Sequence, residues 1–281
     1  MRVLVTGAGG MVGRAVRKDC EQRGDEVHAY DRETLDISDA DLVMATLERD
    51  QPEAVINCAA WTDVDGCESD LRRADAANGL GPENLAKATR RIGAILVTIS
   101  TDYVFDGEGA GFYTQRDTPN PKSVYANTKL DGERRAQVAS ARTVVVRSGF
   151  IFGPGGRNFL STIVARLRRG DKVSAIGDAW GTPTYSRHLA TRLRDLAQLD
   201  LPGIYHVVNS GEGASYEEFA RAVVGALGLD QSLVGSSKAA SLQRPAARPT
   251  NSRLKCVLSE ALGLAPLPHW QDAVKDFVDL V

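Results

Sequence analysis

The chain has 281 residues, which is long enough for one large domain or two unequal ones with a sizeable core. Its formal net charge of −2 argues against a general attraction to nucleic acid or to an anionic membrane surface. No apolar run approaches the roughly 20 residues that a membrane-spanning helix needs. The four cysteines are scattered, without metal-ligand spacing, so we expect reduced thiols, no bound metal and a cytoplasmic location.

Short apolar runs alternate with helical patterns over the first half of the chain. The runs predicted to be strands are 2–7, 26–31, 54–60, 94–101 and 143–149. The segments predicted to be helices are 13–24, 39–49, 75–91 and 125–139. The strands are apolar throughout, which suits parallel strands that are covered on both faces. The alternation therefore predicts an α/β fold with a Rossmann-type, doubly wound parallel sheet.

The pattern loosens past residue 153. We expect helices at 158–170, 186–199, 215–228, 259–264 and 269–281, with strands at 172–178 and 203–210. The second of these strands resembles a sixth buried strand of the sheet, and Ser215 and Glu218 have capping-box spacing. We predict an NAD(P)-binding domain of residues 1–149 plus about 186–210. A smaller C-terminal α/β substrate-binding lobe would comprise about 150–185 plus 211–281.

A glycine-rich turn follows the first predicted strand. Gly7, Gly10 and Gly13 have the spacing G-x-x-G-x-x-G and open the first helix. Glycine allows the backbone to turn sharply and to approach a pyrophosphate, whose charge then faces free N–H groups at the helix start. A glycine pattern alone is weak evidence, but this one lies where a dinucleotide-binding fold requires it. It predicts that the chain binds NADPH or NADH.

The second predicted strand ends in Asp31, 18 residues past Gly13. An acid at this place can accept hydrogen bonds from an adenosine ribose, which favours NAD. Arg32 follows immediately and could bind a 2′-phosphate, so the choice between the two cofactors stays open. The alternative for Asp31 is an exposed turn residue at the strand end.

Tyr125 and Lys129 stand four residues apart in the stretch "VYANTKLDGE", at the start of a predicted helix. Taken alone they could be an ordinary exposed pair on one helix face. The preceding strand, however, ends in Ser100, Thr101 and Asp102, at the sheet edge where this fold class binds ligands. The glycine turn, the strand-end hydroxyl and Tyr-x-x-x-Lys occur in order, which favours a proton donor with a cation that tunes it.

Ketone reduction suits these residues. It needs a hydride at carbon and a proton at the developing alkoxide. A free phenol, with a pKa of about 10, is a poor acid at neutral pH. A neighbouring ammonium favours the phenolate and should bring that pKa toward neutrality. We therefore predict that Tyr125, Lys129 and Thr101 are catalytic, with Thr101 hydrogen-bonded to the substrate oxygen.

Several motifs together resemble the dTDP-4-dehydrorhamnose reductase family of extended short-chain dehydrogenases/reductases. They are "TGAGGMVG", "LDISD", "INCAAWTDVDGCES", "STDYVFDG", "VYANTKLDGE", "GTPTY" and "ARPTNSRL", and the resemblance covers essentially the whole chain. It implies NAD(P)H-dependent reduction of the C4 keto group of dTDP-4-dehydro-L-rhamnose, with Lys129 also holding the nicotinamide ribose. With the residues above, the expected cofactor site comprises Gly7, Gly10, Met11, Val12, Gly13, Asp31, Arg32, Asp36, Ile37, Ala59, Ala60, Trp61, Tyr125 and Lys129.

The substrate side is less completely specified. The resemblance implies that Thr101 and Asp102 contact the sugar. Asn158 and Arg248 are candidates to meet the nucleotide diphosphate, although both could equally hold a loop. Phe150 departs from the family, which has a substrate-contacting tryptophan there; phenylalanine lacks the indole N–H. Another dTDP-4-keto-6-deoxy sugar, as in antibiotic deoxysugar pathways, is therefore an alternative substrate.

Three other functions compete with this hypothesis. Related dehydratases carry Asp-Glu after the strand-end threonine, whereas Tyr103 follows Asp102 here, which disfavours elimination; a 4-epimerase is excluded less firmly. The regulatory subunit of methionine adenosyltransferase also resembles this family, but it would not need the proton donor. Some members bind a cation at a dimer contact, where this chain has Ala15. We therefore expect that the protein binds no metal. We expect it to be a monomer or a homodimer.

Overall fold

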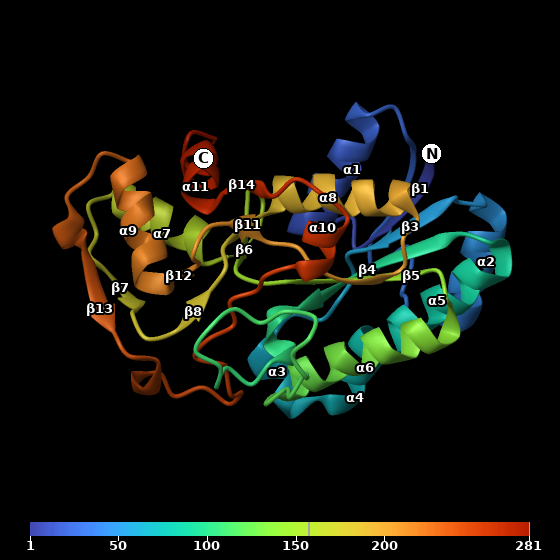
Figure 1. Cartoon of the computed structure of the whole chain (residues 1–281), viewed down its shortest axis with the longest axis horizontal. Coiled ribbons are helices and arrows are strands. Elements are labelled where there is room, and N and C mark those ends of the chain that lie inside the picture. The colour runs from blue at the N-terminus through green and yellow to red at the C-terminus, as the bar shows by residue number, and fades with distance from the viewer. Residues whose placement is uncertain (157, 281) are drawn as a thin grey trace.

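A parallel sheet of six strands forms the centre of the larger part of the molecule, as a computed structural model describing residues 1–156 and 158–280 shows (Figure 1). The strand order is β10-β5-β4-β3-β1-β2, and every neighbouring pair is parallel. The strands are β1 (Arg2–Thr6), β2 (Glu26–Tyr30), β3 (Ala54–Asn57), β4 (Ile95–Thr101), β5 (Thr143–Ser148) and β10 (Gly203–His206). The predicted doubly wound fold is confirmed.

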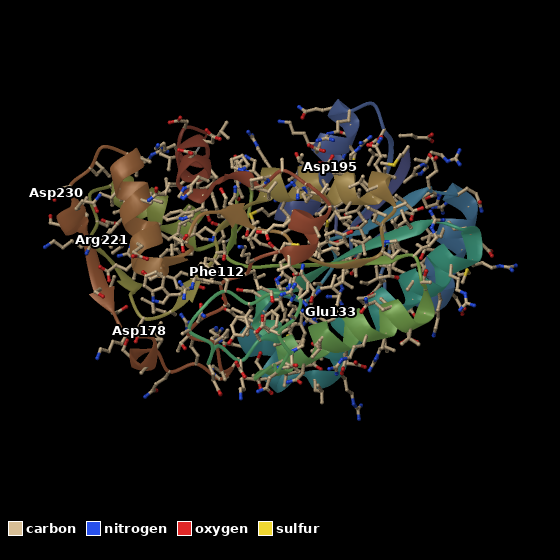
Figure 2. The ribbon with its side chains drawn as sticks, in the orientation of Figure 1. Phe112, Glu133, Asp178, Asp195, Arg221 and Asp230 are labelled. Atoms are coloured by element: carbon tan, nitrogen blue, oxygen red, sulfur yellow. The ribbon has the colours of Figure 1, made fainter. Side chains whose placement is uncertain are left out.

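Helices cover both faces of this sheet. One face carries α1 (Met11–Gln22) and α8 (Ser186–Leu199), whose apolar side chains pack with the strands in one core cluster. The other carries α2 (Ala40–Asp50), α5 (Gly81–Ile92) and α6 (Val124–Ala139), which share a second cluster. Asp195 on α8 and Glu133 on α6 mark the two sides in Figure 2. No helix among the described residues is long and apolar enough to cross a membrane.

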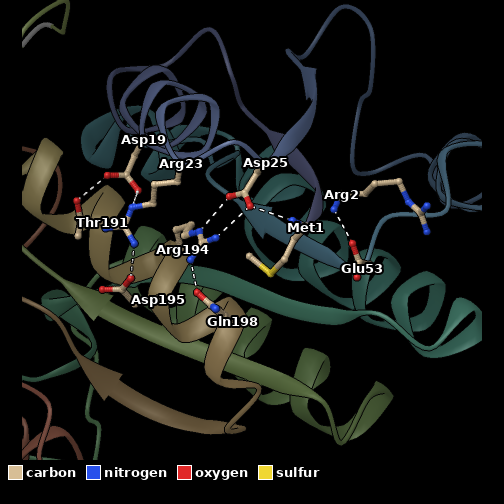
Figure 3. Close-up of polar contacts among 10 residues, drawn as sticks. All are labelled: Met1, Arg2, Asp19, Arg23, Asp25, Glu53, Thr191, Arg194, Asp195 and Gln198. Carbon is tan, nitrogen blue, oxygen red and sulfur yellow. Dashed lines mark hydrogen bonds and ion pairs between the residues drawn. The ribbon is translucent and has the colours of Figure 1, made fainter.

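Polar contacts fix α8 to the first strand–helix–strand unit, although it comes much later in the chain (Figure 3). Arg194 donates to Asp25 at 3.0 Å from both Nε and Nη2, and the amino nitrogen of Met1 donates to the same carboxylate at 3.0 Å. Thr191 donates to Asp19 at 2.7 Å. These contacts and the apolar cluster hold α8 against one face of the large sheet.

The predicted helix 75–91 was wrong in its continuity. The structure has α4 (Leu71–Asp75), one π-helical turn (Ala76–Leu80) and then α5. Helix α6 approaches this turn closely, which Gly132 allows because a Cβ there would lie 2.0 Å from the carbonyl oxygen of Asn78. Within the turn, the Asn78 side-chain amide bonds to the backbone of Trp61, at 2.9 and 3.1 Å. An irregular turn of this kind often lies beside a functional site.

The predicted strand 203–210 was wrong in its length. Only β10 joins the large sheet, while β11 (Asn209–Ser210) pairs with β14 (Leu267–His269). The neighbouring strand β5 ends at Ser148, and the bond from Val207 N to Arg147 O is followed by no further strand pairing there. The chain therefore leaves the sheet where β5, the strand it pairs with, ends.

The remaining segments build a smaller α/β part around a core of its own. Its largest fully buried side chains include Phe152, Tyr185, Phe219 and Phe277. The helices are α7 (Phe159–Arg168), α9 (Tyr216–Ala226) and α11 (Trp270–Val278), and the strands are β6 (Ile151–Phe152), β7 (Val173–Ile176), β8 (Trp180–Gly181), β9 (Thr184–Tyr185), β12 (Ala214–Ser215) and β13 (Val234–Ser237). Arg221 and Asp230 mark its outer end in Figure 2.

Most predicted elements of this part are confirmed within a few residues, and the Ser215–Glu218 capping box is present. The short helix predicted at 259–264 is α10 (Val257–Ala261), and residue 281 of the last predicted helix lies outside the described residues. The division into two domains stays a prediction.

Candidate active site

The glycine turn between β1 and α1 is packed so tightly that it excludes side chains. Gly7 has a φ of +63°, and a Cβ there would lie 2.7 Å from the backbone nitrogen of Ala59. A Cβ on Gly13 would lie 2.2 Å from the carbonyl oxygen of Gly7. Gly10, the N-cap of α1, offers no side-chain cap, so N–H groups of the first turn have no intrahelical partner. This geometry fits a pyrophosphate.

A cavity of about 480 Å³ opens beside this turn, over the ends of β1, β2 and β3. It gathers nine of the predicted cofactor residues, namely Gly7, Gly10, Asp31, Arg32, Asp36, Ile37, Ala59, Ala60 and Trp61. Met11 lies outside it and lines a separate cavity behind the loop. The guanidinium of Arg73, which the sequence did not single out, lies 4.3 Å from the Trp61 ring centroid and lines the same cavity.

The carboxylate of Asp31 is engaged in its own turn. Its Oδ1 accepts from the Glu33 amide at 3.1 Å and from the Thr34 amide and hydroxyl at 3.0 and 2.8 Å. The hydrogen bond from the Thr34 side chain is the main cause that holds the Asp31 pKa below its usual value. Asp31 thus stabilises the turn at the strand end, as the alternative interpretation expects, and it also lines the cavity.

A second cavity, of about 340 Å³, shares Cys58, Ala59 and Ala60 with the first. It brings together the three predicted catalytic residues and is lined by Val12, Cys58, Ala59, Ala60, Thr62, Val64, Ile99, Ser100, Thr101, Asp102, Tyr103, Tyr125, Lys129, Ser148, Gly149, Phe150, Ile151 and Tyr216. Tyr125 is 9% exposed and Lys129 4%. The alternative interpretation of Tyr125 and Lys129 as an exposed helix pair is therefore wrong.

The pKa of Tyr125 differs from the expectation. Burial raises the pKa of this phenol, and its hydrogen bond with Thr101 lowers it by less. The ammonium of Lys129 does not face the phenol as expected, because its Nζ donates to the carbonyl oxygen of Ile99 at 2.6 Å. Burial also lowers the pKa of Lys129 to about 8, against the opposing charge of Glu133. Tyr125 therefore keeps its proton in this state of the protein.

A buried ion pair lies beneath these residues. Arg147 donates to Glu133 from Nη2 at 2.7 Å and from Nε at 3.0 Å, and Ser100 donates to the same carboxylate. Burial of both charges demands this pairing. Sequence reasoning missed the pair. The signal was present, because Glu133 follows Lys129 by four residues on the same helix as Tyr125.

Asp102 is 3% exposed and is held at both carboxylate oxygens. Oδ1 accepts from the Thr101 hydroxyl at 3.1 Å, and Oδ2 accepts from the Ser252 hydroxyl at 2.5 Å. Burial raises the pKa of Asp102 to about 6, although both hydrogen bonds lower it. Ser252 belongs to the predicted motif "ARPTNSRL", but only the fold brings it to Asp102.

Phe150 forms one wall of the second cavity. Its backbone has a φ of +44°, which is unusual for a residue with a side chain. Its ring stacks on that of Tyr216 with centroids 4.3 Å apart, and a Cβ on Gly181 would lie 2.4 Å from its Cε1. The ring is thus confined between α9 and β8. Tyr216 carries no local signal of function and was missed.

Asn158 and Arg248 do not line this cavity. Asn158 caps α7, with Oδ1 accepting from Ser161 N at 2.9 Å, and its Nδ2 donates to Gly153 O at 3.1 Å. Arg248 donates through both Nη atoms to Asp65, each at 2.8 Å. Both residues thus make the loop-holding contacts of the alternative interpretation. Among residues 1–156 and 158–280, no group of three or more His, Cys, Asp and Glu could hold a metal.

The chain is similar to known proteins over its full length. The family model described as RmlD substrate binding domain matches residues 1–281. A dTDP-4-dehydrorhamnose reductase of Streptomyces griseus is 39% identical over 98% of this chain and 92% of its own. A probable dTDP-4,6-dihydroxy-2-methyloxan-3-one 4-ketoreductase of Streptomyces antibioticus is 35% identical over 100% and 96%.

A solved structure agrees with these matches. The crystal structure of a Bacillus anthracis dTDP-4-dehydrorhamnose reductase in complex with NADP superposes with a TM-score of 0.95. It is 29% identical and covers 100% of this chain and 99% of that one. On the full-length family match and the 39% identity, the chain belongs to the dTDP-4-dehydrorhamnose reductase family.

Proposed function

We propose that this protein reduces the C4 keto group of dTDP-4-dehydro-L-rhamnose to give dTDP-L-rhamnose, with NADPH or NADH as reductant. The observation that carries the proposal is the cavity in which Thr101, Tyr125 and Lys129 meet, contiguous with the cavity at the glycine turn. The relatives named above support the reaction and the substrate class. The bound nicotinamide supplies the hydride; the residues of this chain do the rest.

The glycine turn would hold the cofactor by its pyrophosphate. Free N–H groups at the start of α1 face the negative charge, while Gly7 and Gly13 allow the close approach. Asp31 or Arg32 would meet the adenosine ribose. The sides of the site would be formed by Val12, Asp36, Ile37, Ala59, Ala60 and Trp61, while a contact of Met11 with the cofactor stays a prediction.

Tyr125 would donate the proton. Its raised pKa keeps the phenol protonated over the physiological range, so the proton is available when negative charge develops on the substrate oxygen. Lys129, buried and near neutrality in pKa, would hold the nicotinamide ribose through its hydroxyls. Thr101 would orient the C4 oxygen toward Tyr125.

The sugar would lie against Phe150 and Asp102 in the second cavity. The direct role of Asn158 and Arg248 in binding the diphosphate stays a prediction. A second substrate, another dTDP-4-keto-6-deoxy sugar, is favoured by Phe150 and by the 4-ketoreductase relative. A cytoplasmic location, a monomer or homodimer, and the two-domain division with its substrate-binding lobe complete the proposal.

The test is a turnover assay. We expect the protein to oxidise NADPH or NADH, followed by absorbance, when it is given dTDP-4-dehydro-L-rhamnose. A panel of 4-keto-6-deoxy sugar nucleotides distinguishes the two substrates by their kcat/KM values. If none of them causes oxidation although the cofactor binds, the reductase proposal is wrong and a non-catalytic subunit is favoured.

A further inference from the structure

The Thr101 hydroxyl has one proton, and its competing acceptors are Asp102, the Tyr125 oxygen and the substrate oxygen. The hydroxyl donates to Asp102 Oδ1 at 3.1 Å. The Tyr103 amide donates to Thr101 Oγ1 at 3.2 Å, so one lone pair of that oxygen is already used. Since a hydroxyl donates only once, Thr101 cannot donate to Asp102 and to a substrate oxygen together. In this arrangement it would present a lone pair to the lone pairs of the ketone.

We propose that Asp102 sets the direction of the Thr101 hydroxyl, and that only protonated Asp102 makes Thr101 a donor to the substrate. Protonated at Oδ1, the carboxyl donates to Thr101 Oγ1 and frees the threonine proton for the C4 oxygen. When Asp102 is ionised, its Oδ1 accepts the hydrogen bond of the Thr101 hydroxyl, which is then not available to the substrate. The proton on Asp102 comes from solvent, and no covalent bond of the substrate is involved.

Ser252 determines which oxygen of Asp102 carries the proton. Its hydroxyl lies 2.5 Å from Oδ2, which leaves Oδ1 for the proton and for Thr101. Ser252 is 1% exposed, and its amide donates to the carbonyl oxygen of Trp180 at 2.8 Å. Gly149 closes the other side, because a Cβ there would lie 2.2 Å from Oδ2. Ser252 is thus a positioning residue supplied by the C-terminal segment.

The surroundings of Asp102 favour a neutral carboxyl. The titratable groups that face it are phenols: Tyr103 on the same turn, Tyr125 from α6 and Tyr216 from α9. Arg248 from the C-terminal loop acts on Tyr103 and Tyr216. Burial raises the pKa of Asp102 to about 6, so the protonated form is accessible just below neutrality.

The inference rests on the proposed function, and the pH profile of kcat/KM tests it, since this parameter reports groups of the free enzyme. For the wild-type protein, kcat/KM should fall as pH rises through about 6, approaching tenfold per pH unit. In Asp102→Asn, the amide can donate to Thr101 and accept from Ser252, as the protonated acid does. The fall of kcat/KM above about pH 6, the alkaline limb of the profile, should then disappear, and kcat/KM at pH 8 should exceed that of the wild type.

Ser252→Ala is the matched variant. It removes a hydrogen bond that favours the carboxylate, so the limb should move to higher pH. The double variant Asp102→Asn/Ser252→Ala should show no limb to move. A purely structural role of Ser252 would lower the rate without moving the profile.

Infrared spectra of the cofactor-free protein give an independent measurement. A carboxylic acid band that is lost near pH 6 and is absent from Asp102→Asn supports the inference. The inference is overturned if no such band titrates, if the limb persists in Asp102→Asn, or if that variant binds NADPH but is inactive. By contrast, a wild-type protein that oxidises no cofactor at any pH refutes the proposed function itself.

Discussion

The phenol of Tyr125 is the single group whose removal should separate chemistry from binding. We expect Tyr125→Phe to lower kcat by about 10²–10⁴-fold, because the general acid is lost while the ring keeps its packing. NADPH affinity, measured by fluorescence titration, should change little. The matched control is Tyr205→Phe, which removes a hydroxyl that bonds to Leu201 O before β10 and should keep its turnover. Undiminished turnover in Tyr125→Phe would refute the proton-donor role.

Lys129 lies one turn further along α6, yet its role in the proposed site differs from that of Tyr125. Its Nζ is bonded to strand β4 through Ile99 rather than to the phenol, so its charge is held at the floor of the cavity. Their spacing of four residues places both side chains on one face of α6. They nevertheless serve different parts of the proposed site, because only Tyr125 is proposed to donate a proton to the substrate.

The buried pair of Arg147 and Glu133 ties strand β5 to helix α6. Glu133→Gln should lower the free energy of unfolding by about 3–5 kcal/mol, because it leaves a buried guanidinium without its counter-charge. Urea denaturation measures this loss. Arg147→Met combined with Glu133→Gln should recover part of it, since the unpaired charge is gone. A loss below about 1 kcal/mol in the single variant would show that water or another group compensates Arg147.

Elements with a strong local signal were the ones that the sequence predicted. The five apolar runs, the glycine turn and the capped helix α9 each carry their pattern within a short window, so they are confirmed to within a few residues. The π-helical turn at Ala76–Leu80 and the end of β10 depend on neighbours, namely α6 and β5, that local periodicity does not describe.

The same reasoning divides the candidate site. Thr101 ends strand β4 and Tyr125 and Lys129 lie on helix α6, and the sequence correctly predicted that the three lie close together. Tyr216 and Ser252 reach the same region from the C-terminal part: no signal of function marks Tyr216, and the motif that contains Ser252 does not indicate its contact with Asp102. Long-range packing alone selects them.

Two buried groups give the whole molecule opposing responses to acid. Burial raises the pKa of Asp102 from 3.8 to about 6, so its contribution to stability is fully present below about 3.8 and is lost as pH rises through about 6. Burial lowers the pKa of His206 from 6.5 to about 4, so its contribution is present above about 6.5 and is lost as pH falls through about 4. Each amounts to about 3 kcal/mol.

Substitution separates the two. Relative to the wild type, Asp102→Asn should gain about 3 kcal/mol in free energy of unfolding between pH 4 and pH 7, because asparagine carries no charge to bury. His206→Asn should instead gain relative to the wild type as pH falls from 6.5 to 4. Urea denaturation at several pH values measures both differences. Parallel stability curves for Asp102→Asn and the wild type would contradict the burial of an ionisable Asp102.

The course of the chain also limits how the molecule can be divided. Segment 150–185 leaves the large sheet, α8 and β10 return to it, and segment 211–281 leaves again. No single protease cut therefore separates the two cores: a cut near residue 150 leaves α8 and β10 with the smaller core, and a cut near residue 210 leaves α7 and β6–β9 with the large sheet. The pieces of such a cut could reassemble only by folding together, so neither half of the molecule can be expressed as an independent fragment by a single truncation.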